Sequence, residues 1–162
     1  MTDFHELYTR YAGDIYRFAL FLCGDKAEAE EITAETFARA LTGKAPLISA
    51  TVKGYLLTIA RNFHLESVKR RKRFTELPPE LPDSGPHLEQ KIDHKNELEA
   101  LQAYLQMFPE IDRAALLLRV DGLAYAEIAN ALNISLPSAK VKVHRLRLKL
   151  AEWRADRELI KT

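Results

Sequence analysis

The 162-residue sequence contains a single cysteine, Cys23, so no disulfide can form within the chain. Cys23 stands among apolar residues, which favours a small buried side chain over a redox sensor. No apolar run approaches the roughly 20 residues of a membrane-spanning helix, and the start MTDFHELY lacks the basic-then-apolar pattern of a secretory signal. We therefore expect a cytoplasmic protein without membrane insertion.

Groups that catalysis would need are also missing. The five histidines have no metal-ligand spacing, no glycine-rich loop could cradle a phosphate, and Cys23 has no base nearby in the sequence. His64 lies beside a basic run but has no second ligand close to it. The sequence therefore predicts no catalytic residue, no metal site and no cofactor, and a protein that is not an enzyme.

Charge is distributed unevenly, although the net charge is only +1. Residues 1–41 carry a net charge of −4 and residues 74–110 a net charge of −6, whereas residues 61–73 and 138–150 each carry +5. Two basic segments separated by acidic ones favour two contact zones for a polyanion. Composition alone leaves a second interpretation open, in which both basic segments are solvated helix faces.

The spacing of apolar residues predicts three helices in the first half of the chain. The first covers residues 4–23 and ends where Gly24 can adopt a left-handed conformation. The second covers about 26–41 and has an acidic outer face, residues 42–51 form a loop, and the third runs from 52 into the basic segment. The side chains expected to face the core are Phe4, Leu7, Tyr8, Tyr11, Ile15, Phe18 and Leu22 in the first helix, Ala34, Phe37, Ala38 and Leu41 in the second, and Val52, Tyr55, Leu56, Ile59 and Phe63 in the third.

A proline-rich segment, TELPPELPDSGP at residues 75–86, has no hydrophobic period and marks a domain boundary. We predict a first domain at residues 1–74, a linker at 75–90 and a second domain at 91–162. Helical spacing resumes from Leu88, with Leu98, Leu101, Leu105 and Phe108 on one face, and the next helix has Pro109 in its first turn and carries Leu116, Leu117 and Val120. No strand pattern occurs, so the expected fold is all-α, with two small helical domains joined by a flexible linker.

The segment YAEIANALNISLPSAKVKVHRLRLKL, residues 125–150, has the features of a DNA-reading helix-turn-helix. The small Ala129 stands where two helices must approach closely, Ile134 fills the turn, and Pro137 can preset the first turn of the second helix. That helix has an acid-free basic face that fits a major groove. Its predicted inward stripe is Ala139, Val143, Leu146, Leu150 and Trp153, with Val141 and Leu148 pointing away from the core. The alternative is a plain amphipathic surface helix.

The other basic segment, residues 61–73, surrounds the end of an otherwise apolar helix, and contact with phosphates is its simplest function. Tyr55 and Phe63 offer aromatic faces to a base, but their helical spacing favours core packing. The hydroxyls and backbone of loop 42–51 could clamp an extruded base, a possibility that the sequence alone leaves open.

With both halves in view, the chain resembles the extracytoplasmic-function (group 4) sigma factors of bacterial RNA polymerase over nearly its whole length. LYTRYAGDIYRFALFLCGDKAEAEEITAETFARA is similar to the polymerase-binding region 2.1–2.2 of that family. GYLLTIARNFHLESVKRRKR is similar to regions 2.3 and 2.4, and FPEIDRAALLLRVDGLAYAEIANALNISLPSAKVKVHRLRLKL to region 4. The resemblance implies a region 2 bundle of three to four helices and a four-helix region 4 domain.

The resemblance also implies partners and site residues. The partners would be core RNA polymerase, through its β′ clamp and β flap, promoter DNA, and an anti-sigma protein that holds the chain inactive. The residues implied in polymerase binding are Glu30, Glu31, Ile32, Glu35 and Phe37. Those implied at the −10 element are Lys53, Arg61, Asn62, Glu66, Lys69, Arg70 and Arg73. Those implied at the −35 element are Ser138, Lys140, Val141, Lys142, His144, Arg145 and Lys149.

The sequence departs from the family pattern at four positions. Ala34 stands where glutamine is usual, Leu41 and Tyr55 stand where tryptophan is common, and Pro137 replaces a usual glycine before the reading helix. Two other functions compete with promoter recognition: a sigma-like decoy that binds an anti-sigma protein, and a stand-alone helix-turn-helix regulator. The second leaves the motifs of the first half unexplained.

Overall fold

The computed structural model describes residues 4–43, 51–74 and 96–161, and these residues form seven helices and no strand. The helices are α1 (Phe4–Cys23), α2 (Lys26–Thr42), α3 (Val52–Phe74), α5 (Glu97–Leu105), α6 (Glu110–Val120), α7 (Tyr125–Leu132) and α8 (Leu136–Lys161). The predicted all-α fold is confirmed. The predicted linker, the helical start at Leu88 and most of loop 42–51 lie outside the described residues, so the domain bounds stay a prediction.

The turn between α1 and α2 follows from two residues. Gly24 has φ +76°, a conformation that favours glycine. A Cβ at this position would also lie 2.9 Å from the end of the Gln106 side chain, which would have to shift. Asp25 then caps α2, because its carboxylate accepts a hydrogen bond of 2.9 Å from the Glu28 N–H. The helix end predicted at Gly24 is confirmed.

The inward face of α2 differs from the predicted one. Phe37 is buried as expected, but Ala34 and Ala38 are exposed and Leu41 is 62% exposed. The buried face consists of Ala29, Ile32, Thr33, Thr36 and Phe37. Two threonines replace the expected aliphatic residues because their hydroxyls donate to helix carbonyls one turn earlier, each at 2.7 Å, which leaves the methyl groups free to pack.

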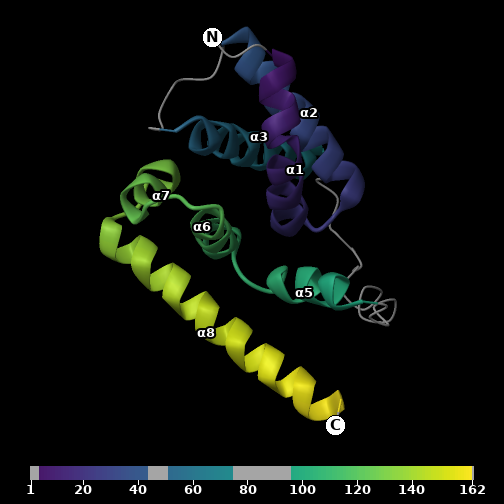
Figure 1. Ribbon diagram of the computed structural model, residues 1–162, viewed down its shortest axis with the longest axis vertical. Coiled ribbons are helices and arrows are strands. Elements are labelled where there is room, and N and C mark those ends of the chain that lie inside the picture. The colour runs from purple at the N-terminus through teal and green to yellow at the C-terminus, as the bar shows by residue number, and fades with distance from the viewer. Residues whose placement is uncertain (1–3, 44–50, 75–95, 162) are drawn as a thin grey trace.

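Helix α3 is buried on more than one side. Leu56, Ile59 and Phe63 are buried as predicted, whereas Val52, expected inside, is 50% exposed. The residues between them are buried as well: Leu57, Thr58, Ala60, Arg61 and His64. A helix buried this widely needs neighbours on two faces. Helices α1 and α2 cover one face, and α6 of the second half lies against another (Figure 1).

In the second half, Asn96 caps α5 and α6 starts directly after Pro109, which occupies the cap position rather than the first turn. Leu105, Leu116 and Leu117 are buried as predicted. Leu98 and Val120 were expected on the core face but are 53% and 68% exposed, so the prediction is wrong for both. Each of them lies at one end of its helix, where fewer elements are available to cover a side chain.

Helices α7 and α8 form the predicted helix-turn-helix. Asn133 takes the left-handed conformation in the turn, with φ +59°. Ala139, Val143 and Leu146 are buried and Leu150 and Trp153 half-buried, while Val141 and Leu148 are exposed as predicted. Beyond the turn, α8 continues to Lys161, and its Trp153 ring stacks on Tyr104 of α5 with centroids 5.2 Å apart.

The two halves share one apolar core, because a single cluster of buried side chains runs from α1–α3 into α5–α8. The contact lies where α6 meets α1 and α3 (Figure 1). Arg113 of α6 is buried and donates two hydrogen bonds, of 2.7 and 3.1 Å, to the Leu22 carbonyl at the end of α1. Gln106 donates to the Phe21 and Leu22 carbonyls at 3.2 and 3.3 Å. The described helices therefore form one closed body.

Candidate nucleic-acid and protein interfaces

Helix α8 presents a cationic face. Its first turn is fixed by Ser135, whose hydroxyl accepts a hydrogen bond of 3.2 Å from the Ser138 N–H. Among the residues predicted at the −35 element, Ser138 and Lys142 are half-buried, and the exposed ones are Lys140, Val141, His144, Arg145 and Lys149. Exposed cations along one helix can reach phosphates and base edges in a major groove.

Two contacts orient the base of this face. The Lys140 ammonium lies 5.9 Å from the centre of the Tyr125 ring on α7. Lys142 pairs with Asp112 of α6 at 3.6 Å between its Nζ and the carboxylate. Tyr125 and Asp112 both belong to the second half, so this cationic face is held by contacts within that half.

The residues predicted at the −10 element separate into two groups. Five of them are exposed and form one stripe along the outer face of α3, because each lies three or four residues from another along the helix: Asn62, Glu66, Lys69, Arg70 and Arg73. We call these five residues the α3 stripe. Lys53 and Arg61 lie elsewhere: both face α6, Arg61 is buried, and both form ion pairs with carboxylates of the second half.

Glu66 and Arg39 anchor the α3 stripe to α2. Arg39 donates to both Glu66 carboxylate oxygens, at 2.8 and 3.2 Å, and to Glu35 at 3.0 Å. The hydrogen bonds from Arg39 lower the pKa of Glu66, and Glu66 in turn raises the pKa of Arg39 above its usual value. Arg39 is not among the residues predicted at either surface, and its spacing of four residues from Glu35 is the sequence signal for this ion pair.

The acidic face of α2 is only partly what the sequence predicted. Glu30 and Glu31 are exposed and Glu35 is half-buried in its pair with Arg39. Ile32 and Phe37 are 1% and 2% exposed, so they are core residues and cannot contact a partner in the chain as folded here. Their two positions fall on the inward face of the helix, together with Thr33 and Thr36.

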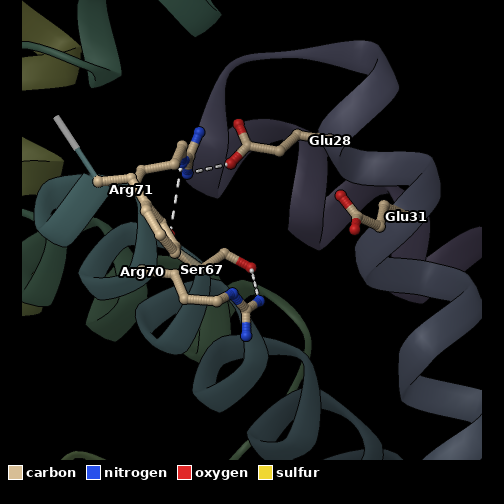
Figure 2. Close-up of a pocket in the computed structure, with 6 residues that line it drawn as sticks. Glu28, Glu31, Ser67, Arg70 and Arg71 are labelled. Carbon is tan, nitrogen blue, oxygen red and sulfur yellow. Dashed lines mark hydrogen bonds and ion pairs between the residues drawn. The ribbon is translucent and has the colours of Figure 1, made fainter.

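A cleft of about 360 Å³ joins the acidic face of α2 to the basic end of α3. Figure 2 shows Glu28 and Glu31 on one wall and Arg70 and Arg71 on the other. Arg71 pairs with Glu28 across the cleft, whereas Arg70 donates to the Ser67 hydroxyl at 3.3 Å. Acidic and basic surfaces of the first half are thus adjacent.

Two family models match this chain, one for each half. The Sigma-70 region 2 model matches residues 7–74, and the Sigma-70 region 4 model matches residues 98–150. The ECF RNA polymerase sigma factor SigM of Bacillus subtilis is 32% identical over 148 residues, which cover 90% of this chain and 91% of SigM. The chain belongs to the extracytoplasmic-function (ECF) sigma factors. The family resemblance predicted from the sequence is confirmed.

Further relatives support the same assignment. The ECF RNA polymerase sigma factor SigE of Mycolicibacterium smegmatis is 36% identical over 162 residues, covering 96% of this chain but only 63% of SigE. This ECF sigma factor therefore spans less than two thirds of that relative. A solved structure of the sigma factor RpoE from Bartonella quintana, in complex with the anti-sigma factor NepR, has the same fold, with a TM-score of 0.74 at 20% identity over 94% of this chain and 96% of RpoE.

ECF sigma factors are alternative sigma factors that direct transcription initiation by RNA polymerase, and sigma factors are not enzymes. Within residues 4–43, 51–74 and 96–161, no helix is both long and apolar enough to cross a membrane. The same part of the chain has no group of three His, Cys, Asp or Glu side chains arranged to hold a metal ion.

Proposed function

We propose that this ECF sigma factor recognises promoters through two separate surfaces, with α8 reading the −35 element and the α3 stripe acting at the −10 element. The observation that carries the proposal is the pair of exposed cationic faces, one on each half, at the two segments that match sigma regions 2 and 4. Contacts to phosphates would position each face, and side chains that reach base edges would give sequence preference.

Lys142 and Arg145 are the proposed base readers on α8, and Lys140 and Lys149 the proposed phosphate contacts. The exposed Val141 lies in the first turns of the helix, where it could contact a thymine methyl group. Asn62 is the proposed reader of the α3 stripe, because its amide is exposed and can both donate to and accept from a base once the strands separate.

The proposed docking surface for core polymerase is the outer face of α2, with Glu30, Glu31 and Glu35. Ala34 lies exposed among these acids, and its methyl group cannot form the hydrogen bonds of the glutamine usual in the family. We expect weaker docking on polymerase than in relatives that carry the glutamine. An anti-sigma protein is the second proposed partner, and the cytoplasm, where RNA polymerase works, is the proposed location.

Run-off transcription with purified core polymerase on a library of genomic promoters tests the function. Promoter-dependent transcripts are expected only when the protein is present. Without such transcripts, tight operator binding by the free protein would support a stand-alone regulator, and binding to an anti-sigma protein alone would support a decoy. Two double variants with the same change of charge test the docking surface: Glu30→Lys/Glu31→Lys on α2 and, as the control, Glu99→Lys/Glu158→Lys. Only the first variant should lose affinity for core polymerase, whereas a general effect of charge would lower the affinity of both.

Asn62→Ala tests the −10 surface. We expect strand opening, measured by permanganate reactivity of unpaired thymines, to fall more than binding to the closed duplex. Asn130→Ala serves as the matched control, since Asn130 is an exposed asparagine on α7, outside the α3 stripe. Equal losses of opening and duplex binding would argue against the role of Asn62.

A further inference from the structure

Glu66 is the one acid of the α3 stripe, whose other members are an amide and three cations. It lies one helical turn, about 6 Å, beyond Asn62 on the same face. A carboxylate repels the phosphates that a nucleic-acid surface must approach. The ion pair with Arg39 joins α3 to α2, yet the Glu66 side chain stays 48% exposed. A purely structural ion pair does not account for this exposure within the stripe.

Arg39 holds the Glu66 carboxylate in one orientation. Its Nη1 and Nη2 atoms donate to the two carboxylate oxygens, at 3.2 and 2.8 Å. The guanidinium is itself held, because its Nε donates to Glu35 at 3.0 Å and its Cζ lies 5.1 Å from the centre of the buried Phe63 ring. The Glu66 carboxylate therefore loses little rotational freedom when a further group binds it, which favours tight and selective binding.

The contact with Arg39 leaves Glu66 able to accept further hydrogen bonds. A carboxylate has two oxygens with about four lone-pair positions, and the hydrogen bonds from Arg39 use one on each oxygen. These hydrogen bonds also lower the pKa of Glu66, so the group is ionised at neutral pH. An ionised carboxylate accepts hydrogen bonds and donates none, so it distinguishes donors from acceptors in the group opposite it.

The exocyclic groups of the bases differ in this respect. Cytosine N4 and adenine N6 carry N–H donors, whereas thymine O4 and guanine O6 are acceptors. A carboxylate therefore attracts the amino bases and repels a keto oxygen, and Glu and Asp are the side chains that typically accept from cytosine N4.

We infer that Glu66, held by Arg39, selects a base with an exocyclic amino group, cytosine or adenine, beside the base that Asn62 reads. Arg39 is a positioning residue, because it acts through Glu66. The inference rests on the proposed −10 function of the α3 stripe and adds the chemical class of base that the stripe takes. The three cations of the stripe offset the repulsion between Glu66 and the phosphates.

Cytosine and uracil test the inference directly, because they differ only in the amino or keto group at C4. Fluorescence anisotropy measures the Kd of the full chain for labelled oligo-deoxycytidine and oligo-deoxyuridine of about 12 nucleotides, without polymerase and at low salt. A slightly alkaline pH keeps the oligo-deoxycytidine single-stranded. The wild type should bind oligo-deoxycytidine about fivefold more tightly than oligo-deoxyuridine.

Three variants assign the preference to the Glu66–Arg39 pair. Glu66→Gln should lower the affinity ratio to about one, because an amide also donates to a keto oxygen. Arg39→Met should lower it to about twofold, and Arg39→Lys, which keeps a cation beside Glu66, should recover part of the loss. Glu99→Gln, with the same change of charge at an exposed position of α5, is the matched control and should keep the wild-type ratio.

A purely structural ion pair gives a different result. The Glu66 and Arg39 variants would then lower the melting temperature, or the affinity for both oligonucleotides equally, and leave the ratio unchanged. Circular dichroism checks the folding of each variant. A wild-type ratio near one, or a ratio that Glu66→Gln does not change, would overturn the inference, and the wild-type ratio decides alone if a variant does not fold.

Run-off transcription from a promoter with a randomised −10 element separates this inference from the proposed function. The wild type should favour C or A over G or T at one position by about tenfold, and Glu66→Gln should relax the preference at that position only. Without promoter-dependent transcripts the proposed function fails, whereas the oligonucleotide ratio still decides the role of Glu66. Transcripts whose base preference does not depend on Glu66 would refute the inference alone.

Discussion

The burial of Arg113 makes a quantitative prediction for the variant Arg113→Met. Arg113 is 7% exposed, and its guanidinium donates three hydrogen bonds, two to the Leu22 carbonyl and one of 2.7 Å to the Phe108 carbonyl. Burial lowers the pKa of Arg113, but an arginine stays charged at neutral pH. The cation therefore compensates the negative end of the α1 dipole from inside the core. Methionine keeps the apolar stem and removes the charge and the donors.

The expected loss is about 2–4 kcal/mol of the free energy of unfolding. Hydrogen bonds from a charged donor contribute about 1.5–3 kcal/mol each, and the variant loses three of them. Burying a charged group costs several kcal/mol, and the variant no longer has this cost, so part of the loss is offset. The Leu22 carbonyl also keeps the hydrogen bond from Gln106. A loss of this size is a large fraction of the roughly 5–15 kcal/mol that stabilises an ordinary domain.

Urea denaturation followed by circular dichroism measures the loss, and the melting temperature should fall by roughly 4 to 16 °C. Arg119→Met is the matched control on the same helix. Arg119 donates one hydrogen bond of 3.0 Å to the Leu123 carbonyl and lies over the Tyr125 ring, both within the second half. Its removal should cost only about 1 kcal/mol. If Arg113→Met costs no more than the control, Arg113 does not hold the two halves together.

Three further predictions concern other groups. Lys142→Ala or Arg145→Ala should weaken binding to the −35 element by about 1–3 kcal/mol if the side chain contacts a base edge. Competition with DNA that carries base substitutions should then show a loss of affinity at certain bases only. A loss of affinity that is equal across all sequences would indicate a phosphate contact instead. Burial lowers the pKa of His64, so as the pH falls below about 6.5 this histidine takes up a proton in the unfolded chain before it does so in the folded chain. Acidification therefore lowers the free energy of unfolding, and urea denaturation at several pH values should show a steeper decrease in the wild type than in His64→Leu. Burial raises the pKa of Cys23 to about 11, so at neutral pH its thiolate fraction is about a hundredfold lower than that of an ordinary thiol, and its reaction with Ellman's reagent should be slow until urea unfolds the chain.

Local sequence signals predicted the elements of this ECF sigma factor well. Gly24, Ile134 in the turn, and the apolar period of α7 and α8 mark features that depend only on nearby residues, and the structure has them at the predicted places. Recognition of the family likewise depended on local motifs in each half. The misassigned face of α2 shows the limit of the apolar period, because Thr33 and Thr36 satisfy their hydroxyls within the helix and pack like aliphatic side chains.

The sequence could not predict which cations are buried between the halves. Arg61 and Lys53 stand in or near a basic segment, which predicts side chains that face solvent. No feature of the sequence around Arg113 predicts that its side chain is buried. Arg61 is buried and Lys53 half-buried because they pair with Glu110 and Asp121, which lie about 50 or more residues away along the chain. Arg113 is buried because α6, on which it lies, packs against α1. Helical spacing and charge predict the exposed α3 stripe. Its separation from Lys53 and Arg61 follows only from the packing of the two halves, which local sequence does not reveal.

The length of α8 has a mechanical consequence. The helix is continuous from Leu136 to Lys161, about 39 Å at 1.5 Å per residue, and extends past the last residue of the region 4 match at position 150. The turns that carry the proposed −35 residues lie near its N-terminal end, and the stacked Trp153 and Tyr104 rings join it to α5 about 16 Å beyond Lys142. This contact lies outside the helix-turn-helix. It restrains the angle between α8 and α5, and with it the direction in which the proposed −35 residues point.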